Sequence, residues 1–251
     1  MGQKKGKAMS AAQPTGRRGR ANAADRLHAL QQEIMELILE RGLVPGDPLP
    51  TEHELVEELG VGRNTVRESL KVLQALGIID VRHGYGMFVA TKQLGALAAT
   101  LEFHSRLSLR NGGHEALELV EVRQALESGL IGAAIDAMTA PALQTVRAAV
   151  EDMEARAEAG QPLSEADERF HRGLFEPLEN GMLTNLLGVF WSAYSKLHEQ
   201  MDPADDLLLE TARHHRDIYE AVAAGDKATA ARLMAGHFDG IRGLIRTTVG
   251  G

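Results

Sequence analysis

The sequence predicts a mainly α-helical protein with one small β-hairpin, in two parts that meet near residue 92. Apolar residues recur at helical spacing through most of the 251 residues, and strand-like alternation is confined to two short runs within residues 78–90. Charge divides at the same place: residues 1–92 carry 13 Lys and Arg against 11 Asp and Glu, whereas residues 93–251 carry 14 against 24. A polyanionic partner would therefore have to bind the first part.

The composition excludes several classes of protein. The chain has no cysteine, so disulfides and thiolate metal sites are ruled out. No apolar run approaches the roughly 20 residues that span a bilayer. The N-terminus has basic residues but no apolar segment, so it does not resemble a secretory signal. We expect a cytoplasmic protein with no membrane partner.

The first predicted elements are a basic arm and a helix. Residues 1–22 are rich in Gly, Ala, Lys and Arg, with six basic and no acidic side chains in the first twenty, which is typical of a disordered arm. A helix is expected from about Ala24 to Arg41. Its apolar face consists of Leu27, Leu30, Ile34, Leu37 and Ile38.

Two further helices and a hairpin follow the connector VPGDPLP. The segment TEHELVEELG starts with a capping box of Thr51 and Glu54. A tight turn around residues 60–62 separates it from GRNTVRESLKVLQALG. The runs IIDV and MFVA flank RHGYG, whose glycines favour a hairpin. This order predicts a winged helix-turn-helix over residues 23–92, with the hairpin as the wing.

The third helix of this domain carries a basic stripe. Val66, Leu70, Leu73 and Leu76 are expected to face the core, with the basic residues on the opposite side. The polar set is Arg63, Asn64, Thr65, Arg67 and Lys71. The first turn of such a helix reaches base edges in the major groove, and an arginine fork matches guanine or a phosphate. An ordinary solvated helix face is the alternative, but the turn, the hairpin and the basic arm together favour DNA.

The run LPTEHELVEELGVGRNTVRESLKVLQALGIIDVRHGYGMFV resembles the winged-helix domain of the GntR family of bacterial transcription regulators. The resemblance implies that Arg63 and Arg67 contact operator DNA, and that His83 and Gly84 at the wing tip reach the minor groove or its phosphates. Thr51 and His53 complete the expected DNA-binding set. His53 stands where the family commonly has Arg, and Gly62 stands where a Ser usually caps the recognition helix.

Residues 93–251 predict an all-helical bundle that also mediates dimerisation. From about Leu94 onward there are no convincing strands, and the breaks NGG, TAP, GQP, ENG, DP and GD divide the region into six or seven helices.

Three histidines lie on apolar faces of three of these helices: His171, His215 and His237. Each alone would more often be a hydrogen-bonded core residue, but three together suggest one common partner. Asp167 lies on the same face as His171, although it could instead belong to a cap with Ser164. One Asp and three His suit a divalent ion such as Zn²⁺, Ni²⁺ or Mn²⁺, with positions left for a ligand oxygen.

Arg123 also faces the expected core, in LELVEVRQALESGLIGAAI. It could be neutralised by Glu127, four residues on, as a purely structural pair. Alternatively, its fork could bind the carboxylate of an effector that also coordinates the metal.

The second half resembles the FCD ligand-binding domain of the FadR-type branch of GntR regulators. The segments ADERFH, ARHHRDIYEAVAAGD and ARLMAGHFDGI carry this resemblance, and the earlier helices match more loosely. It implies that Asp167, His171, His215 and His237 are the metal-binding residues.

The expected function is that of a homodimeric transcription regulator, a repressor rather than an enzyme, located with the nucleoid. Its affinity for double-stranded operator DNA would be controlled by a small organic or sugar acid, bound at the metal site beside Arg123. Two alternatives remain: a metal-dependent enzyme tethered to a DNA-binding module, and a structural cluster with no effector.

Overall fold

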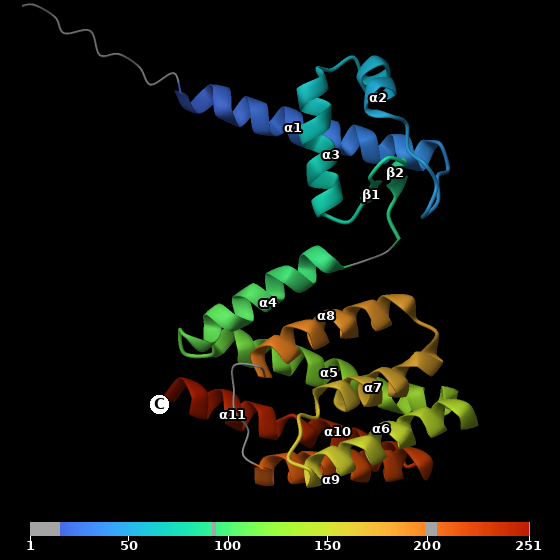
Figure 1. Ribbon diagram of the computed structural model, residues 1–251, viewed down its shortest axis with the longest axis vertical. Coiled ribbons are helices and arrows are strands. Elements are labelled where there is room, and N and C mark those ends of the chain that lie inside the picture. Colours follow the sequence, from blue (N-terminus) through green and yellow to red (C-terminus); the bar gives the residue numbers. More distant parts are fainter. Residues whose placement is uncertain (1–15, 92–93, 199–204, 251) are drawn as a thin grey trace, which may run out of the picture. The chain divides into compact units, whose positions relative to one another are not determined.

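The chain folds into two compact units, residues 1–93 and 94–251. This computed structural model describes residues 16–91, 94–198 and 205–250 (Figure 1). Among these residues, every helix is too short or too polar to cross a membrane.

The N-terminal unit is a winged helix, as predicted. Its elements are α1 (Gly16–Glu40), α2 (Glu52–Leu59), α3 (Arg63–Ala75), β1 (Ile79–Arg82) and β2 (Gly86–Val89). The core is closed by α1 packing on α3 and by α3 packing on α2 and β1 (Figure 1). Its buried side chains are Leu30, Ile34, Leu37, Ile38, Leu49, Leu55, Val66, Leu70, Leu73 and Ile79.

Two local expectations for this unit need correction. The first helix begins at Gly16 rather than near Ala24, so residues 16–22, expected in the disordered arm, form its first turns. Arg and Ala are strong helix formers, and they extend the helix past the point where its apolar face starts. Residues 1–15 lie outside the described residues. Leu76, expected in the core, is exposed because α3 ends before it and Leu76 forms the C-cap.

The hairpin is a regular antiparallel pair, in which Ile79 lies opposite Val89 and Arg82 opposite Gly86. The connector before α2 covers the other edge of β2. The backbone N–H of Leu49 donates to the carbonyl of Met87 at 2.8 Å, and that of Gly46 donates to the carbonyl of Val89 at 2.8 Å. These bonds fix the base of the wing and leave its tip in solvent.

The C-terminal unit is an all-α bundle. Its α-helices are α4 (Gly95–Leu109), α5 (His114–Ala137), α6 (Ala140–Glu158), α7 (Ser164–Phe175), α8 (Gly181–His198), α9 (Asp205–Ala223), α10 (Lys227–His237) and α11 (Asp239–Gly250). A short 3-10 helix, η1 (Glu176–Leu178), follows α7. The described residues thus form eight α-helices, not the six or seven expected. The extra break falls at Phe238, between α10 and α11, where Gly236 and Gly240 flank it but the apolar periodicity continues across it.

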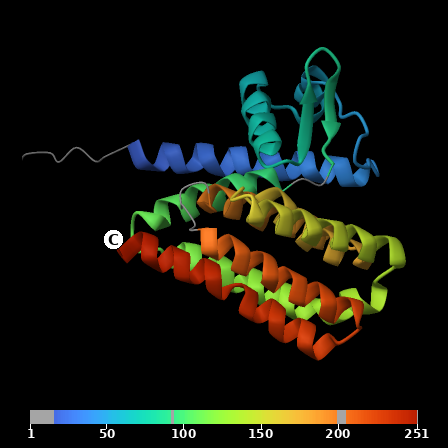
Figure 2. The ribbon, with the colours of Figure 1, turned by 60° about the horizontal axis from the view of Figure 1, so that its bottom comes forward.

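The helices of this unit lie alongside one another around a shared core. Figures 1 and 2 show α10 beside α5 and α9, and α7 beside α6. Large buried side chains such as Phe170, Ile218 and Met234 fill the space between them. Polar residues of α5, α7 and α9 are buried in the same interior, beside the half-buried His237 of α10, and they form the candidate site described next.

Candidate functional site

One face of α3 is exposed and carries basic side chains. Arg63, Asn64 and Thr65 form its first turn, and Arg67 and Lys71 follow on the same exposed side. The side chains of Arg63, Arg67 and Lys71 are 62%, 54% and 63% exposed. The core-facing side of α3 buries Val66, Leu70 and Leu73. Because α3 is amphipathic, its cationic side chains face solvent while its apolar side packs on the core. The cationic side chains lie toward the N-terminal end of α3, just after the tight turn.

The other residues predicted to bind DNA are also exposed. His83 and Gly84 lie at the wing tip, between the two strands. Thr51 caps α2 in the predicted capping box: its hydroxyl accepts from the backbone of Glu54, whose carboxylate accepts from the backbone N–H of Thr51 at 2.7 Å. His53 lies in the first turn of α2, with Nε2 3.6 Å from a carboxylate oxygen of Glu57, one turn further on.

A carboxylate lies beside the two arginines. Nε of Arg67 donates to Oε2 of Glu52 at 3.1 Å, and its NH2 lies 3.0 Å from Oε1. Nε of Arg63 lies 3.8 Å from the same Oε1. Sequence reasoning missed this contact because Glu52 is fifteen residues from Arg67.

In the C-terminal unit, the four residues predicted to bind a metal come together. One ligand atom from each of Asp167, His171, His215 and His237 lies within 4.8 Å of the others. Asp167 and His171 are one turn apart on α7, His215 comes from α9, and His237 is the last residue of α10. Bundle packing, rather than any local motif, collects them.

The four side chains contact one another closely. Nε2 of His215 lies 2.6 Å from Oδ1 of Asp167. Nε2 of His171 lies 3.3 Å from the same oxygen, but without hydrogen-bond geometry. The alternative role for Asp167, in a cap with Ser164, is absent, since α7 begins at Ser164 itself and no side chain caps it. Asp167 instead faces the histidines.

Outer contacts orient two of the rings. A carboxylate oxygen of Glu127, on α5, forms a very short contact with Nδ1 of His171. Nδ1 of His215 donates to the carbonyl of Thr211 at 2.8 Å. A histidine that donates from one ring nitrogen presents the other as a lone pair, and such second-layer acceptors are typical of metal-binding histidines. Both Nε2 atoms therefore point into the cluster.

The electrostatics of the cluster favour an anionic Asp167 and a neutral His237, whereas His171 shifts the other way: burial would lower its pKa, but the charge of Glu127 raises it above its usual value. Burial alone would raise the pKa of Asp167, but the charges and hydrogen bonds of His215 and His171 hold it well below its usual value. Burial, and then the charges of His215 and His171, hold the pKa of His237 well below its usual value. A carboxylate and a neutral imidazole are the forms in which these residues bind metals.

These residues fit a divalent metal ion. Nε2 of His171 and Nδ1 of His237 are buried and lack hydrogen-bond partners. Buried polar atoms are nearly always satisfied, so two orphaned imidazole nitrogens beside a carboxylate indicate a missing partner. Nitrogen and oxygen donors of this kind suit Zn²⁺, Ni²⁺ or Mn²⁺.

Arg123 lies next to the cluster and is buried. Its Nε donates to Oε1 of Glu127 at 2.5 Å, so the structural pair considered above is present. Its guanidinium carbon also lies 4.7 Å from the centre of the Trp191 ring, a cation–π contact. Burial would lower the pKa of Arg123, but the charges of Glu127 and Asp167 raise it above its usual value, so it stays cationic.

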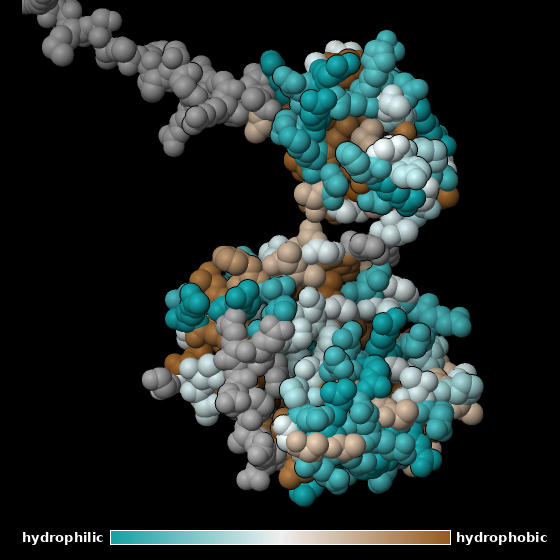
Figure 3. All heavy atoms as spheres, viewed as in Figure 1, coloured by the Kyte–Doolittle hydropathy of each residue, from teal (hydrophilic) through white to brown (hydrophobic). Residues whose placement is uncertain are grey.

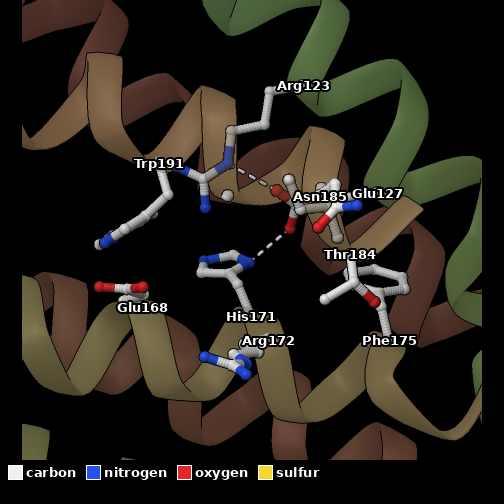
Figure 4. A pocket seen from close by; sticks show the side chains of 11 residues that line it. Arg123, Glu127, Glu168, His171, Arg172, Phe175, Thr184, Asn185 and Trp191 are labelled. Atoms are coloured by element: carbon white, nitrogen blue, oxygen red, sulfur yellow. Dashed lines mark hydrogen bonds and ion pairs between the residues drawn. The ribbon is translucent and has the colours of Figure 1, made fainter. Parts of the chain in front are cut away.

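A cavity of about 250 Å³ opens beside this group. Figure 4 shows the guanidinium of Arg123 and the ring of His171 facing its interior, joined through Glu127, with Glu168 and Arg172 on α7 at its side. Thr184, Asn185 and Trp191 line it from α8. A second cavity of about 290 Å³ is lined by Arg123 and by His237. Arg123 thus lines both of these cavities, whereas a smaller one, lined by Asp167, is not lined by Arg123.

Sequence reasoning did not assign a role at the site to Glu127 or Trp191. Glu127 was considered only as a partner of Arg123, whereas it also contacts His171, 44 residues away. The available signal was its position on the buried face of α5, one turn after Arg123. No local signal pointed to Trp191.

Comparisons with known proteins agree with both halves of the chain. Residues 28–89 match the family described as bacterial regulatory proteins, gntR family, and residues 118–240 match the FCD domain. An uncharacterised HTH-type transcriptional regulator of Mycobacterium tuberculosis is 31% identical, over 82% of this chain and 84% of its own length.

Two further relatives extend this result. The galactonate operon transcriptional repressor of Escherichia coli is 28% identical, over 76% of this chain and 84% of its own. The solved structure of a Streptococcus agalactiae GntR protein has a TM-score of 0.58 and 26% identity, covering 86% of this chain and 98% of that one.

The chain thus combines a winged helix-turn-helix that has an exposed basic face with an FCD domain. It is also similar to transcription regulators over more than three quarters of its length. The protein belongs to the GntR family of bacterial transcription regulators, in the FadR-type branch that carries an FCD domain.

Proposed function

We propose that this regulator lowers or raises its affinity for operator DNA when a small carboxylate binds at a metal site in its C-terminal unit. The observation that carries the proposal is the Asp/His₃ cluster, in which Asp167, His171 and His215 are buried and His237 is half-buried. It has two buried imidazole nitrogens without hydrogen-bond partners and lies next to the buried cation Arg123. Binding of DNA by the N-terminal unit does not require such a cluster in the C-terminal unit. The cluster is explained if it binds a metal ion.

The DNA-binding residues we propose are those exposed on α3, on the wing and at the start of α2. The first turn of α3 and Arg67 would enter the major groove, where arginine forks recognise guanine. Lys71, Thr51 and His53 would contact phosphates, and His83 and Gly84 would contact the minor groove. The partner is double-stranded DNA in the cytoplasm, at the nucleoid.

The effector site combines two cations. Asp167, His171, His215 and His237 would hold the metal ion, which when bound supplies open coordination positions for a carboxylate oxygen. Arg123 is held in place by Glu127 and by Trp191, so it is ready to bind a second oxygen without losing further conformational entropy. The hydroxyl of Thr184, which lines the cavity, suits the hydroxyl groups of a hydroxy or sugar acid.

Regulation would follow from linkage. An effector that binds one conformation of the bundle better than the other changes operator affinity by the same coupling free energy, typically about 1–3 kcal/mol. The galactonate relative is named a repressor, and this supports a repressor role for this protein. For a repressor that is relieved by its effector, the effector weakens binding to DNA.

We also propose a homodimer, which would match a pseudo-palindromic operator. On α4 the large side chains Leu97, Phe103 and Leu107 are exposed, and Figure 3 shows hydrophobic side chains gathered over this helix. A second copy would cover them. Sedimentation of the wild type and of Phe103→Glu tests this: the variant should shift toward monomer, and an unchanged dimer would place the interface elsewhere.

The metal is tested by elemental analysis of protein purified without chelators. About one ion per chain is expected in the wild type, and little in His171→Ala/His215→Ala. His214→Ala serves as the matched control, because this neighbouring histidine lies outside the cluster. If the wild type contains no metal, the proposed coordination of the effector carboxylate by a metal ion is wrong.

The effector is tested on a duplex that the full-length protein selects from a random library. Metal-loaded protein on this duplex is titrated with hydroxy and sugar acids, with their uncharged amides as controls. At least one acid should weaken DNA binding by about fivefold or more, and Arg123→Lys, which keeps the charge but lacks the fork, should respond weakly. No response to any acid would support a structural cluster instead.

A further inference from the structure

The ion pair between Glu52 and the two arginines of α3 is unexpected on a DNA-facing surface. Glu52 is the first residue of α2, and its side chain is 30% exposed. It lies between the cationic groups that we assign to DNA, where a carboxylate repels phosphates. If Glu52 did nothing but repel phosphates, it would only weaken the binding of DNA. Its close contacts with Arg67 suggest a second role.

The geometry of the contact selects one edge of the Arg67 guanidinium. Both Glu52 oxygens are used, one against Nε and one against NH2. This occupies the side edge of the guanidinium and not its terminal edge, formed by NH1 and NH2, and the Arg67 side chain is 54% exposed. The terminal edge carries two parallel N–H donors, which match the O6 and N7 acceptors of guanine.

The position of Glu52 is itself well determined. Thr51 caps α2 through the capping box, and Glu52 follows at the positive end of the helix dipole, where a carboxylate is stabilised. The packing of α2 on α3 then sets the distance to Arg67. A long arginine side chain on a solvated face is otherwise free to take many rotamers.

We infer that Glu52 is a positioning residue for sequence recognition. It holds the Arg67 fork with its terminal edge outward, and it keeps phosphates away from that fork, so that Arg67 reads a base. The gain is in discrimination between sequences rather than in total affinity. This inference rests on the proposed DNA contacts of Arg63 and Arg67.

The test compares full-length variants on two duplexes: one selected by the wild type from a random library, and a shuffled duplex of the same composition. Dissociation constants are measured at several salt concentrations. Glu52→Gln keeps the size of the side chain and removes its charge. Discrimination, the ratio of the dissociation constant on the shuffled duplex to that on the selected duplex, should fall about tenfold. This is the scale of one bidentate contact with a base. Affinity for the shuffled duplex should rise, with a salt slope steeper by about one ion, because Arg67 becomes a phosphate contact.

Three controls separate positioning from other effects. Glu57→Gln removes one charge from the same helix away from Arg67, and it should change both duplexes alike. Glu52→Asp should restore part of the discrimination. In an Arg67→Ala background, Glu52→Gln should leave discrimination unchanged, because Glu52 acts through Arg67.

Several results would overturn the inference. Unchanged discrimination in Glu52→Gln would do so. An equal loss of affinity for both duplexes would also do so, because it would indicate a structural role for Glu52. The same loss in the Arg67→Ala background would mean that Glu52 reads the DNA directly. If Arg67→Ala itself binds the selected duplex like the wild type, the proposed DNA contact fails as well, and this distinguishes the two failures.

Discussion

The two sites hold their charges in opposite surroundings. On α3, Arg63, Arg67 and Lys71 lie more than half in solvent. In the bundle, Arg123, Glu127 and Asp167 are 5%, 1% and 5% exposed. Exposed ion pairs contribute roughly 0–1 kcal/mol to folding, whereas loss of one partner from a buried pair costs about 3–5 kcal/mol. The basic surface of α3 can therefore vary without harm to the fold, but the buried charged residues of the bundle cannot.

The largest effect is expected at Glu127. Glu127→Ala would leave Arg123 and His171 buried without their shared carboxylate, and it should lower the free energy of unfolding by about 3–5 kcal/mol. Urea denaturation of the full chain measures this. Glu151→Ala, which breaks an exposed pair with Arg147, is the control and should leave the unfolding midpoint nearly unchanged. Similar midpoints for both variants would contradict the contrast between the sites.

Removal of the metal should have the next largest effect. A ligand present at a hundredfold excess over its dissociation constant stabilises the folded state by about 2.7 kcal/mol. Calorimetry with and without a chelator should show this loss in the wild type and in His214→Ala, but not in His171→Ala/His215→Ala. A chelator that lowers the transition temperature equally in all three proteins would argue against the site.

Arg67→Ala should change function without changing the fold. Loss of a bidentate base contact costs about 1–3 kcal/mol of binding per site and relaxes specificity there. Stability should change by less than about 0.5 kcal/mol, as is usual for an exposed residue. Anisotropy on the selected duplex and thermal unfolding measure the two quantities. Arg147→Ala, an exposed arginine in the other unit, should bind like the wild type. Wild-type affinity in Arg67→Ala would remove it from the DNA-binding set.

The smallest effect concerns the cap of α2. Thr51→Ala should destabilise the N-terminal unit by about 1 kcal/mol. Hydrogen bonds from the Thr51 backbone and hydroxyl hold the pKa of Glu54 below its usual value. The cap therefore stabilises at neutral pH, and this contribution is lost as the pH falls through the folded-state pKa of Glu54. Thr139→Ala removes the simpler cap of α6 and should cost no more than Thr51→Ala. A larger cost at Thr139 would contradict a stabilising contribution from the hydrogen bond that the Thr51 hydroxyl donates to the Glu54 carboxylate.

Sequence reasoning succeeded wherever the signal was local. The capping box at Thr51, the turn before α3 and the glycine-flanked hairpin each depend on neighbours within a few residues, and each occurs as predicted. It was less successful at three boundaries of helices. Helix α1 starts at Gly16, ahead of its apolar face; Leu76 falls just past the end of α3, before Gly77; and the last helix breaks at Phe238, between Gly236 and Gly240. Glycines are near all three, but the apolar periodicity around them did not show where each helix ends.

The sequence by itself determined the winged helix, the basic face of α3 and the four residues that now form the cluster, because helical periodicity places a side chain on a face. Only the tertiary structure decided which faces meet. It brought Glu127 to His171 across 44 residues and Glu52 to Arg67 across fifteen. Periodicity is a property of one helix, whereas a carboxylate acquires its partner from the angle and distance at which two helices pack.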